Sequence, residues 1–142
     1  MKTSARNQFS GIVGQVTAGA VNDEVTIETD GGAQIVATVT HDSASRLGLK
    51  AGARAVALVK ATSVIVMVDA DASKVSARNV VDGKVTALTK GAVNADVTIT
   101  GSNGLAVSAI ITNNSVDRLG LAVGSAAAAM FKASSVIVGI DG

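Results

Sequence analysis

The segment T-H-D-S-A-S-R-L-G, residues 40–48, carries the strongest indication of the fold. Thr40 and Ser43 supply hydroxyl groups that cap helix starts, helix-tolerant residues follow, and Gly48 stands where helices commonly end in a left-handed glycine. The segment therefore predicts a helix of about two turns. The segment T-N-N-S-V-D-R-L-G, residues 112–120, has the same pattern and predicts a second helix of the same length.

The whole chain is a tandem repeat, offset by the 72 residues that separate Ser4 from Ser76 and aligned without a gap. Three motifs recur at this offset: residues 4–7 (S-A-R-N) at 76–79, residues 19–22 (G-A-V-N) at 91–94, and residues 60–61 (K-A) at 132–133. The period exceeds the roughly 20–50 residues of solenoid repeats. It predicts two copies of one small domain, residues 1–70 and 73–142, with a linker over residues 69–74.

Each repeat contains five stretches rich in β-branched residues, and the predicted helix lies after the third. In the first repeat these stretches are residues 12–16, 21–28, 33–40, 53–60 and 63–68. This order is typical of a five-stranded Greek-key barrel of the OB type. We therefore predict an all-β fold of two OB-fold-like five-stranded Greek-key barrels, each with one short helix. A small β-sandwich with a helical corner is the alternative.

The amino-acid composition limits what kind of core, partners and cellular compartment this protein can have. Of 142 residues, 48% are hydrophobic, yet there is no Trp or Tyr and there are only two Phe, so Val, Ala, Ile and Leu must form the cores. This is more apolar material than two small cores need, which predicts a homo-oligomer. The net charge of +1 gives no strong attraction to nucleic acid or anionic membranes. Without cysteine, a signal-peptide pattern or a membrane-length apolar run, the sequence predicts a cytoplasmic protein.

The sequence offers little for catalysis. His41 is the only histidine, and its counterpart in the second repeat is Asn113. A lone histidine beside a helix start is usually a surface or capping residue, and a catalytic triad or metal cage needs partners that the sequence lacks. We expect no enzyme activity and no protein-bound metal cation.

Anion binding is better supported, because three features recur in both repeats. Lys60 and Lys132 each end an apolar run, and an ammonium drawn against a barrel interior is costly unless an anion meets it; a lysine that keeps its head in solvent at a strand end is the simpler alternative. Two hydroxyl residues flank each helix start, where one alone could act as the cap. The S-A-R-N motif recurs unchanged. Together these groups predict donors for a tetrahedral oxyanion.

The S-A-R-N, G-A-V-N, T-x-x-S and K-A motifs, in this order and in both repeats, resemble the Mop domain of the molbindins, so the chain is similar to a tandem di-Mop molbindin. The resemblance implies an OB-type fold, a homotrimer, and molybdate or tungstate bound at subunit interfaces for intracellular storage or homeostasis. It implies no organic cofactor. Thr3 and Val75 stand where the family commonly has Leu, and Thr62 where it commonly has Ser; none of these departures removes a proposed donor.

The resemblance implies two classes of oxyanion-binding residues. The interface class comprises Ser4, Arg6, Thr40, Ser43, Lys60 and Ala61 in the first repeat, and Ser76, Arg78, Thr112, Ser115, Lys132 and Ala133 in the second. The class near the threefold axis comprises Ala20, Val21 and Asn22, and Ala92, Val93 and Asn94.

Two other functions remain open on the sequence alone. OB folds often bind single-stranded nucleic acid, but such proteins use aromatic platforms and a basic groove, which two Phe and a net charge of +1 do not provide. The chain could also be a structural oligomer that binds no oxyanion.

Overall fold

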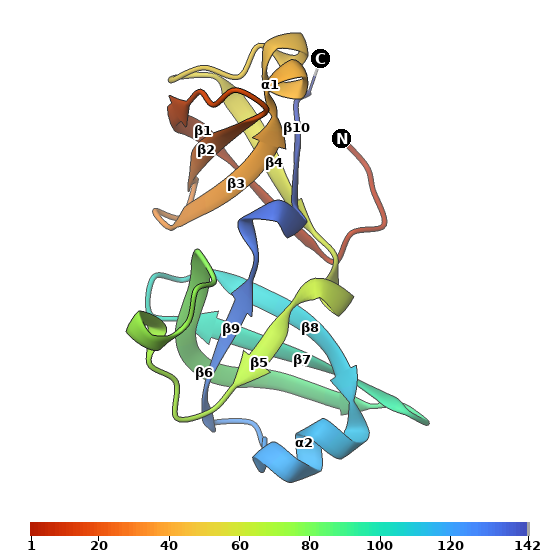
Figure 1. Cartoon of the computed structure of the whole chain (residues 1–142). Helices are drawn as coiled ribbons and strands as arrows, with labels where there is room; N and C mark the ends of the chain where they lie inside the picture. Colours follow the sequence, from red (N-terminus) through yellow and green to blue (C-terminus); the bar gives the residue numbers. More distant parts are fainter. Residues whose placement is uncertain (142) are drawn as a thin grey trace. The chain divides into compact units, whose positions relative to one another are not determined.

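The computed structural model describes residues 1–141 and shows, in this range, two sets of five strands with one short α-helix in each set (Figure 1). In the first repeat these elements are β1 (Asn7–Thr17), β2 (Asn22–Thr29), β3 (Gln34–Thr40), α1 (His41–Leu47), β4 (Arg54–Val59) and β5 (Ile65–Met67). In the second repeat they are β6 (Asn79–Lys90), β7 (Asn94–Gly101), β8 (Ala106–Thr112), α2 (Asn113–Leu119), β9 (Ala126–Phe131) and β10 (Val136–Gly139). Three 3-10 turns complete the elements: η1 (Ala61–Ser63), η2 (Ala72–Lys74) and η3 (Ala133–Ser135).

The strands form two antiparallel five-stranded sheets. Their orders are β10-β4-β1-β2-β3 and β5-β9-β6-β7-β8. In the first sheet β10 also packs against β3, and in the second β5 packs against β8, so each sheet curls until its two edges meet. The predicted fold of two OB-like five-stranded barrels, each with one short helix, is therefore confirmed, in place of the alternative β-sandwich.

The last strand of each repeat belongs to the barrel of the other repeat. One compact unit, unit 1, contains Met1–Lys60 and the chain from Lys132 onward, whereas unit 2 contains Ala61–Phe131. The predicted boundaries, residues 1–70 and 73–142, divide the sequence repeats, but the compact units differ from them by this exchange. Residues 64–66 and 136–138 share the sequence V-I-V, so either segment fits the same position in a barrel.

Alternation of buried and exposed residues explains the strands. In β2 every second side chain from Asp23 to Thr29 is buried, with Val25 and Ile27 fully inside. In β1 and β6 the register shifts after Val13 and after Val85, at equivalent positions of the two repeats. Such bulges bend a strand and help a sheet to close into a barrel. The aliphatic core that the composition predicted is therefore formed by strand positions facing inward.

Both predicted helices are present and have the predicted caps. Thr40 and Thr112 are the N-caps, and the C-caps Gly48 and Gly120 adopt left-handed conformations with φ of 66° and 65°. A residue with a Cβ is strained in this conformation, which accounts for glycine at both ends. Among residues 1–141, no helix has the length and apolar character needed to cross a lipid bilayer.

Engineered disulfides test the strand exchange directly, because the natural chain has no cysteine. Leu58 of β4 and Ile137 of β10 lie opposite each other in the ladder, at a separation that a disulfide can span. We expect the Leu58→Cys/Ile137→Cys variant to form a disulfide under mild oxidation, detected by peptide mass mapping. The Leu58→Cys/Ile65→Cys variant is the control, since these positions would be opposite each other only if each repeat kept its own last strand. Efficient bridging in the control alone would contradict the exchange.

Candidate oxyanion-binding site

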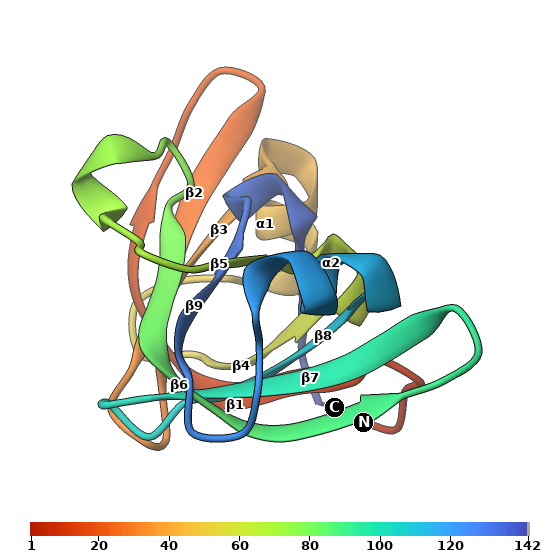
Figure 2. The same ribbon diagram turned by 90° about the horizontal axis from the view of Figure 1, so that it is seen from below.

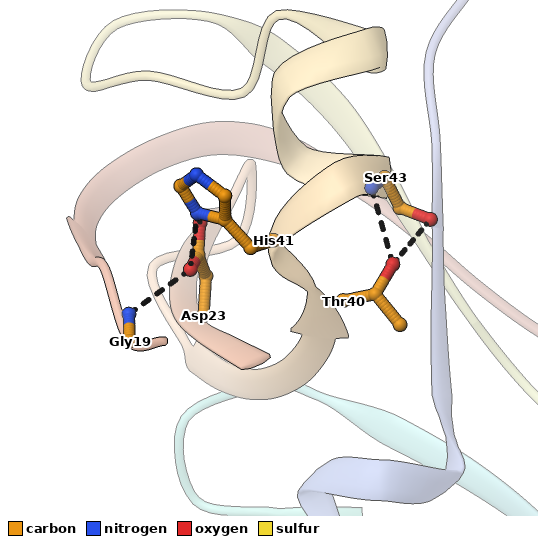
Figure 3. A network of polar contacts seen from close by, with 5 residues as sticks. All are labelled: Gly19, Asp23, Thr40, His41 and Ser43. Carbon is orange, nitrogen blue, oxygen red and sulfur yellow. Dashed lines mark hydrogen bonds and ion pairs between the residues drawn. The ribbon is translucent and has the colours of Figure 1, made fainter. Parts of the chain in front are cut away.

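Each helix start brings together the two hydroxyl residues predicted from the sequence. The Thr40 hydroxyl oxygen accepts a hydrogen bond from the Ser43 backbone N–H (3.1 Å) and donates its own hydrogen to the Ser43 hydroxyl (2.8 Å; Figure 3). Thr112 and Ser115 repeat this geometry at 3.0 and 2.9 Å. The threonine is thus the N-cap of each helix, which agrees with the interpretation that one hydroxyl residue alone caps the helix. Because the serine hydroxyl accepts from the threonine, its own hydrogen can be donated to a ligand.

The two lysines lie at strand ends with their side chains exposed. Lys60 follows β4 and Lys132 follows β9, and neither has an ion-pair partner among the interactions of residues 1–141. Of the two interpretations that the sequence left open, the structure shows the lysine that keeps its head in solvent: both side chains are exposed, while buried neighbours such as Val59 and Phe131 fill the core. An exposed ammonium on a fixed strand end is nevertheless accessible to an anion.

The S-A-R-N motif has a structural role in addition to any binding role. Asn7 is 1% exposed and its side-chain amide donates to the carbonyl oxygen of Val59 (3.2 Å), which fixes the start of β1 beside the end of β4. Ser4 and Arg6 precede this anchor and are exposed. In the second repeat Asn79 is likewise buried, whereas Ser76 and Arg78 are exposed. The buried asparagine explains part of the motif's recurrence.

The strand exchange changes which predicted residues are neighbours within one chain. Turn η3, which begins at Ala133 directly after Lys132, packs against β3, the strand that ends at Thr40. Turn η1, which begins at Ala61, packs against β8, the strand that ends at Thr112. The turns that begin at Ala61 and Ala133 therefore lie against the threonine-bearing strand of the other repeat, whereas the resemblance grouped these residues by repeat.

The two G-A-V-N loops project at the tips of long hairpins and are exposed (Figure 2). Residues 19–22, the 19–22 loop, connect β1 to β2, and the side chain of Val21 is 74% exposed. Residues 91–94, the 91–94 loop, connect β6 to β7, and Val93 is 69% exposed. Exposed valines on a hairpin tip are suited to contact another molecule.

Each loop is tied to the helix start of its own unit. The backbone N–H of His41 donates to the Val21 carbonyl oxygen, and that of Asn113 donates to the Val93 carbonyl oxygen, both at 2.8 Å. Because His41 and Asn113 directly follow the N-cap threonines, the two predicted residue classes are neighbours in each unit: the loop residues on one side and the Thr–Ser pair on the other.

In unit 1 a hydrogen-bonded contact between Asp23 and His41 adds to this connection. Nδ1 of His41 lies 2.9 and 3.1 Å from the two carboxylate oxygens of Asp23, and the Gly19 backbone N–H donates to the same carboxylate at 3.1 Å. Figure 3 shows this cluster on the opposite side of the helix start from Thr40 and Ser43. The hydrogen bond from His41 lowers the pKa of Asp23 below its ordinary value of 3.8; desolvation opposes the shift, and the Gly19 N–H and the positive imidazole add to it.

In unit 2 the same connection is made without charge. Ala95 takes the place of Asp23, and Asn113 takes that of His41. The side-chain amide of Asn113 donates to the Gly91 carbonyl oxygen (2.9 Å), while its own Oδ1 is buried and has no hydrogen-bond partner among residues 1–141.

Sequence reasoning missed Asp23, and it treated His41 as an isolated surface or capping residue. A signal was present, since the two repeats differ at both positions together: Asp and His in the first, Ala and Asn in the second. A paired difference of this kind indicates contact between the two side chains.

The chemistry available at these positions is donation of hydrogen bonds. Serine and threonine hydroxyls, lysine ammonium groups and exposed backbone N–H groups all supply hydrogens. Within residues 1–141 no group of three or more His, Asp or Glu side chains is arranged to hold a metal cation. The arrangement therefore suits an anion.

Comparisons with known proteins agree with this chemistry. The TOBE domain matches the chain twice, at residues 3–66 and 75–138. The molybdenum transport protein ModE of Herbaspirillum seropedicae is 42% identical over 99% of this chain, which spans about half of that relative's length (52%). Molybdenum-pterin-binding protein 2 of Clostridium pasteurianum is 42% identical over 47% of this chain and 98% of its own length. A crystal structure of the cytoplasmic molybdate-binding protein ModG with molybdate bound is 45% identical, with a TM-score of 0.93 over 99% of this chain and all of that one.

The Asp23–His41 contact makes stability depend on pH in the acid range. Because the pKa of Asp23 is lowered on folding, its ionised form stabilises the folded state above about pH 4, and this contribution is lost as the pH falls through the lowered value. We expect Asp23→Asn to reduce the difference in unfolding free energy between pH 6 and pH 3, measured by urea denaturation. An unchanged difference in the variant would show that the contact does not operate in solution.

Proposed function

Because this chain belongs to the TOBE-domain family, with two copies of the domain in tandem, we propose that it binds molybdate, or the nearly isosteric tungstate, without catalysing a reaction. The observation that carries the proposal is the agreement with ModG, which extends over both chains from end to end at 45% identity. The longer ModE relative contains about as much sequence again as this chain covers, so its activity as a whole is not transferred. The single-stranded nucleic-acid alternative is not favoured.

The donor chemistry supports this ligand class. Molybdate at neutral pH is a dianion with four acceptor oxygens and no hydrogen to donate. Hydroxyls, backbone N–H groups and an ammonium offer it donors only, and each charge-assisted hydrogen bond contributes about 1.5–3 kcal/mol. Hydrogen phosphate carries a proton that needs an acceptor, so such a site disfavours it. Sulfate has the charge of molybdate but is smaller, and the size of the site must exclude it.

The proposed donors fall into the two predicted classes. The interface class consists of the Thr–Ser pair at each helix start (Thr40 and Ser43 in the first repeat), the lysine at the end of each apolar strand, and the exposed Ser and Arg of each S-A-R-N motif. The 19–22 and 91–94 loops form the class near a symmetry axis. The strand exchange supports a different combination of repeats, in which Lys132 and Ala133 serve the helix start of α1, and Ala61 serves that of α2.

We also propose that the working form is a homotrimer in the cytoplasm, where it stores or buffers the oxyanion. Large apolar side chains are exposed on strand β10 and on the loops, including Ile137 at 59% and Val21 at 74%. Association of chains would remove this apolar surface from water. When the chains associate, donors that are exposed in the single chain become partly shielded from water, and this shielding strengthens their hydrogen bonds to an anion.

The lysines provide the sharpest test of the binding function. We expect Lys60→Ala and Lys132→Ala each to weaken molybdate binding about tenfold or more, the loss expected for a hydrogen bond to a charged group, as measured by isothermal titration calorimetry. The double variant should lose more than either single variant and retain the oligomer and the fold.

Lys50→Ala is the matched control, because Lys50 is also exposed but lies after α1, away from the K-A segments. It should bind molybdate as the natural chain does. Equal affinities in the natural chain and the double variant would reject these lysines as ligands, and absence of binding by the natural chain would reject the proposed function itself.

A further inference from the structure

The two repeats hold the same loop against the same helix start with different chemistry. Unit 1 uses the carboxylate of Asp23 and the imidazole of His41, whereas unit 2 uses the neutral amide of Asn113 with Ala95 in place of the acid. The backbone bond from residue 41 or 113 to the loop is the same in both units, at 2.8 Å. The units differ in the side chains that clamp the first residue of the loop and in the acceptor of its backbone N–H, which is the Asp23 carboxylate for Gly19 and the Asn94 carbonyl oxygen for Gly91.

In unit 1 the clamp joins three segments through one buried carboxylate. Asp23 is 3% exposed and lies in β2; it accepts hydrogen bonds from Gly19 at the beginning of the loop and from His41 at the beginning of α1. An ionised carboxylate only accepts, so both partners must present hydrogens to it. A buried carboxylate that loses either partner is left poorly compensated, which is costly.

In unit 2 the clamp joins two segments and leaves an acceptor unused. The Asn113 amide holds the carbonyl oxygen of Gly91, and the Gly91 N–H donates to the Asn94 carbonyl oxygen (2.7 Å). Oδ1 of Asn113 is buried and, in the described part of the chain, has no hydrogen-bond partner. The loop is thus closed onto itself and held by one neutral side chain.

We propose that Asp23 and His41 are positioning residues that fix the conformation of the 19–22 loop and thereby set its affinity for molybdate in unit 1. The inference rests on the proposed function, in which the loop presents donors to the anion. A donor set binds tightly only when it is ordered before the ligand arrives, because ordering a mobile loop on binding lowers the affinity. The Nδ1 hydrogen of His41 and the Gly19 N–H also supply the hydrogen bonds that the buried Asp23 carboxylate needs.

The second repeat supplies a matched rescue variant. Asp23→Ala alone and His41→Asn alone each break the hydrogen-bonded contact between the two side chains, whereas the double variant Asp23→Ala/His41→Asn reproduces the residues found at Ala95 and Asn113. We expect each single variant to speed amide hydrogen exchange in the 19–22 loop and to weaken one class of molybdate sites about tenfold in the full-length chain. The double variant should restore slow exchange and most of the affinity.

Asp30→Ala serves as a control, because Asp30 forms an exposed ion pair with Arg54 in the same unit, away from the loop; it should change neither readout. Loop exchange that is the same in the single variants and the natural chain would overturn the proposal, as would faster exchange with unchanged molybdate affinity. The double variant carries the neutral clamp of unit 2, which should hold the loop as it does there. Loop exchange as fast, and molybdate affinity as low, in the double variant as in the single variants would therefore also contradict the proposal. A natural chain that binds no molybdate would instead defeat the proposed function, and the exchange measurements would still decide whether the pair positions the loop.

Discussion

The antiparallel pairing of β10 with β4, and of β5 with β9, is the constraint on which the rest of the structure depends. A domain of about 70 residues buries too little surface to be more than marginally stable alone, and these barrels have almost no aromatic residues to enlarge their cores. By exchanging the last strand, each repeat completes the barrel of the other.

The exchange also decides where the proposed lysine ligands lie. The chain leaves unit 1 after Lys60 and returns to it at Lys132. Each lysine is flanked by buried residues, Val59 and Ala61 in one case and Phe131 and Ala133 in the other. The backbone on both sides is thus held by the cores while the ammonium remains in solvent. This arrangement fixes a cation without the cost of burying it, and it matches the alternative of a lysine that keeps its head in solvent at a strand end.

Much of the fold followed from the sequence, because its signals are local. Alternation marked the strands, paired hydroxyls and glycines marked the helix ends, and the internal repeat fixed the number of barrels. The family resemblance drawn from the motifs is confirmed by the two TOBE matches and by the relatives. The strand exchange was not predicted, since the V-I-V segments at 64–66 and 136–138 suit either barrel equally. The Asp23–His41 pair was missed because its partners are 18 residues apart and meet only through the hairpin.

Recognition of a tetrahedral dianion by hydrogen-bond donors alone can be tested by thermal unfolding in the presence of different oxyanions. A ligand that binds only the folded protein raises its stability by RT ln(1 + [L]/Kd). The account predicts that molybdate and tungstate raise the melting temperature progressively as their concentration exceeds the dissociation constant, while phosphate at the same ionic strength does not. No increase with molybdate, or the same increase with phosphate, would contradict it.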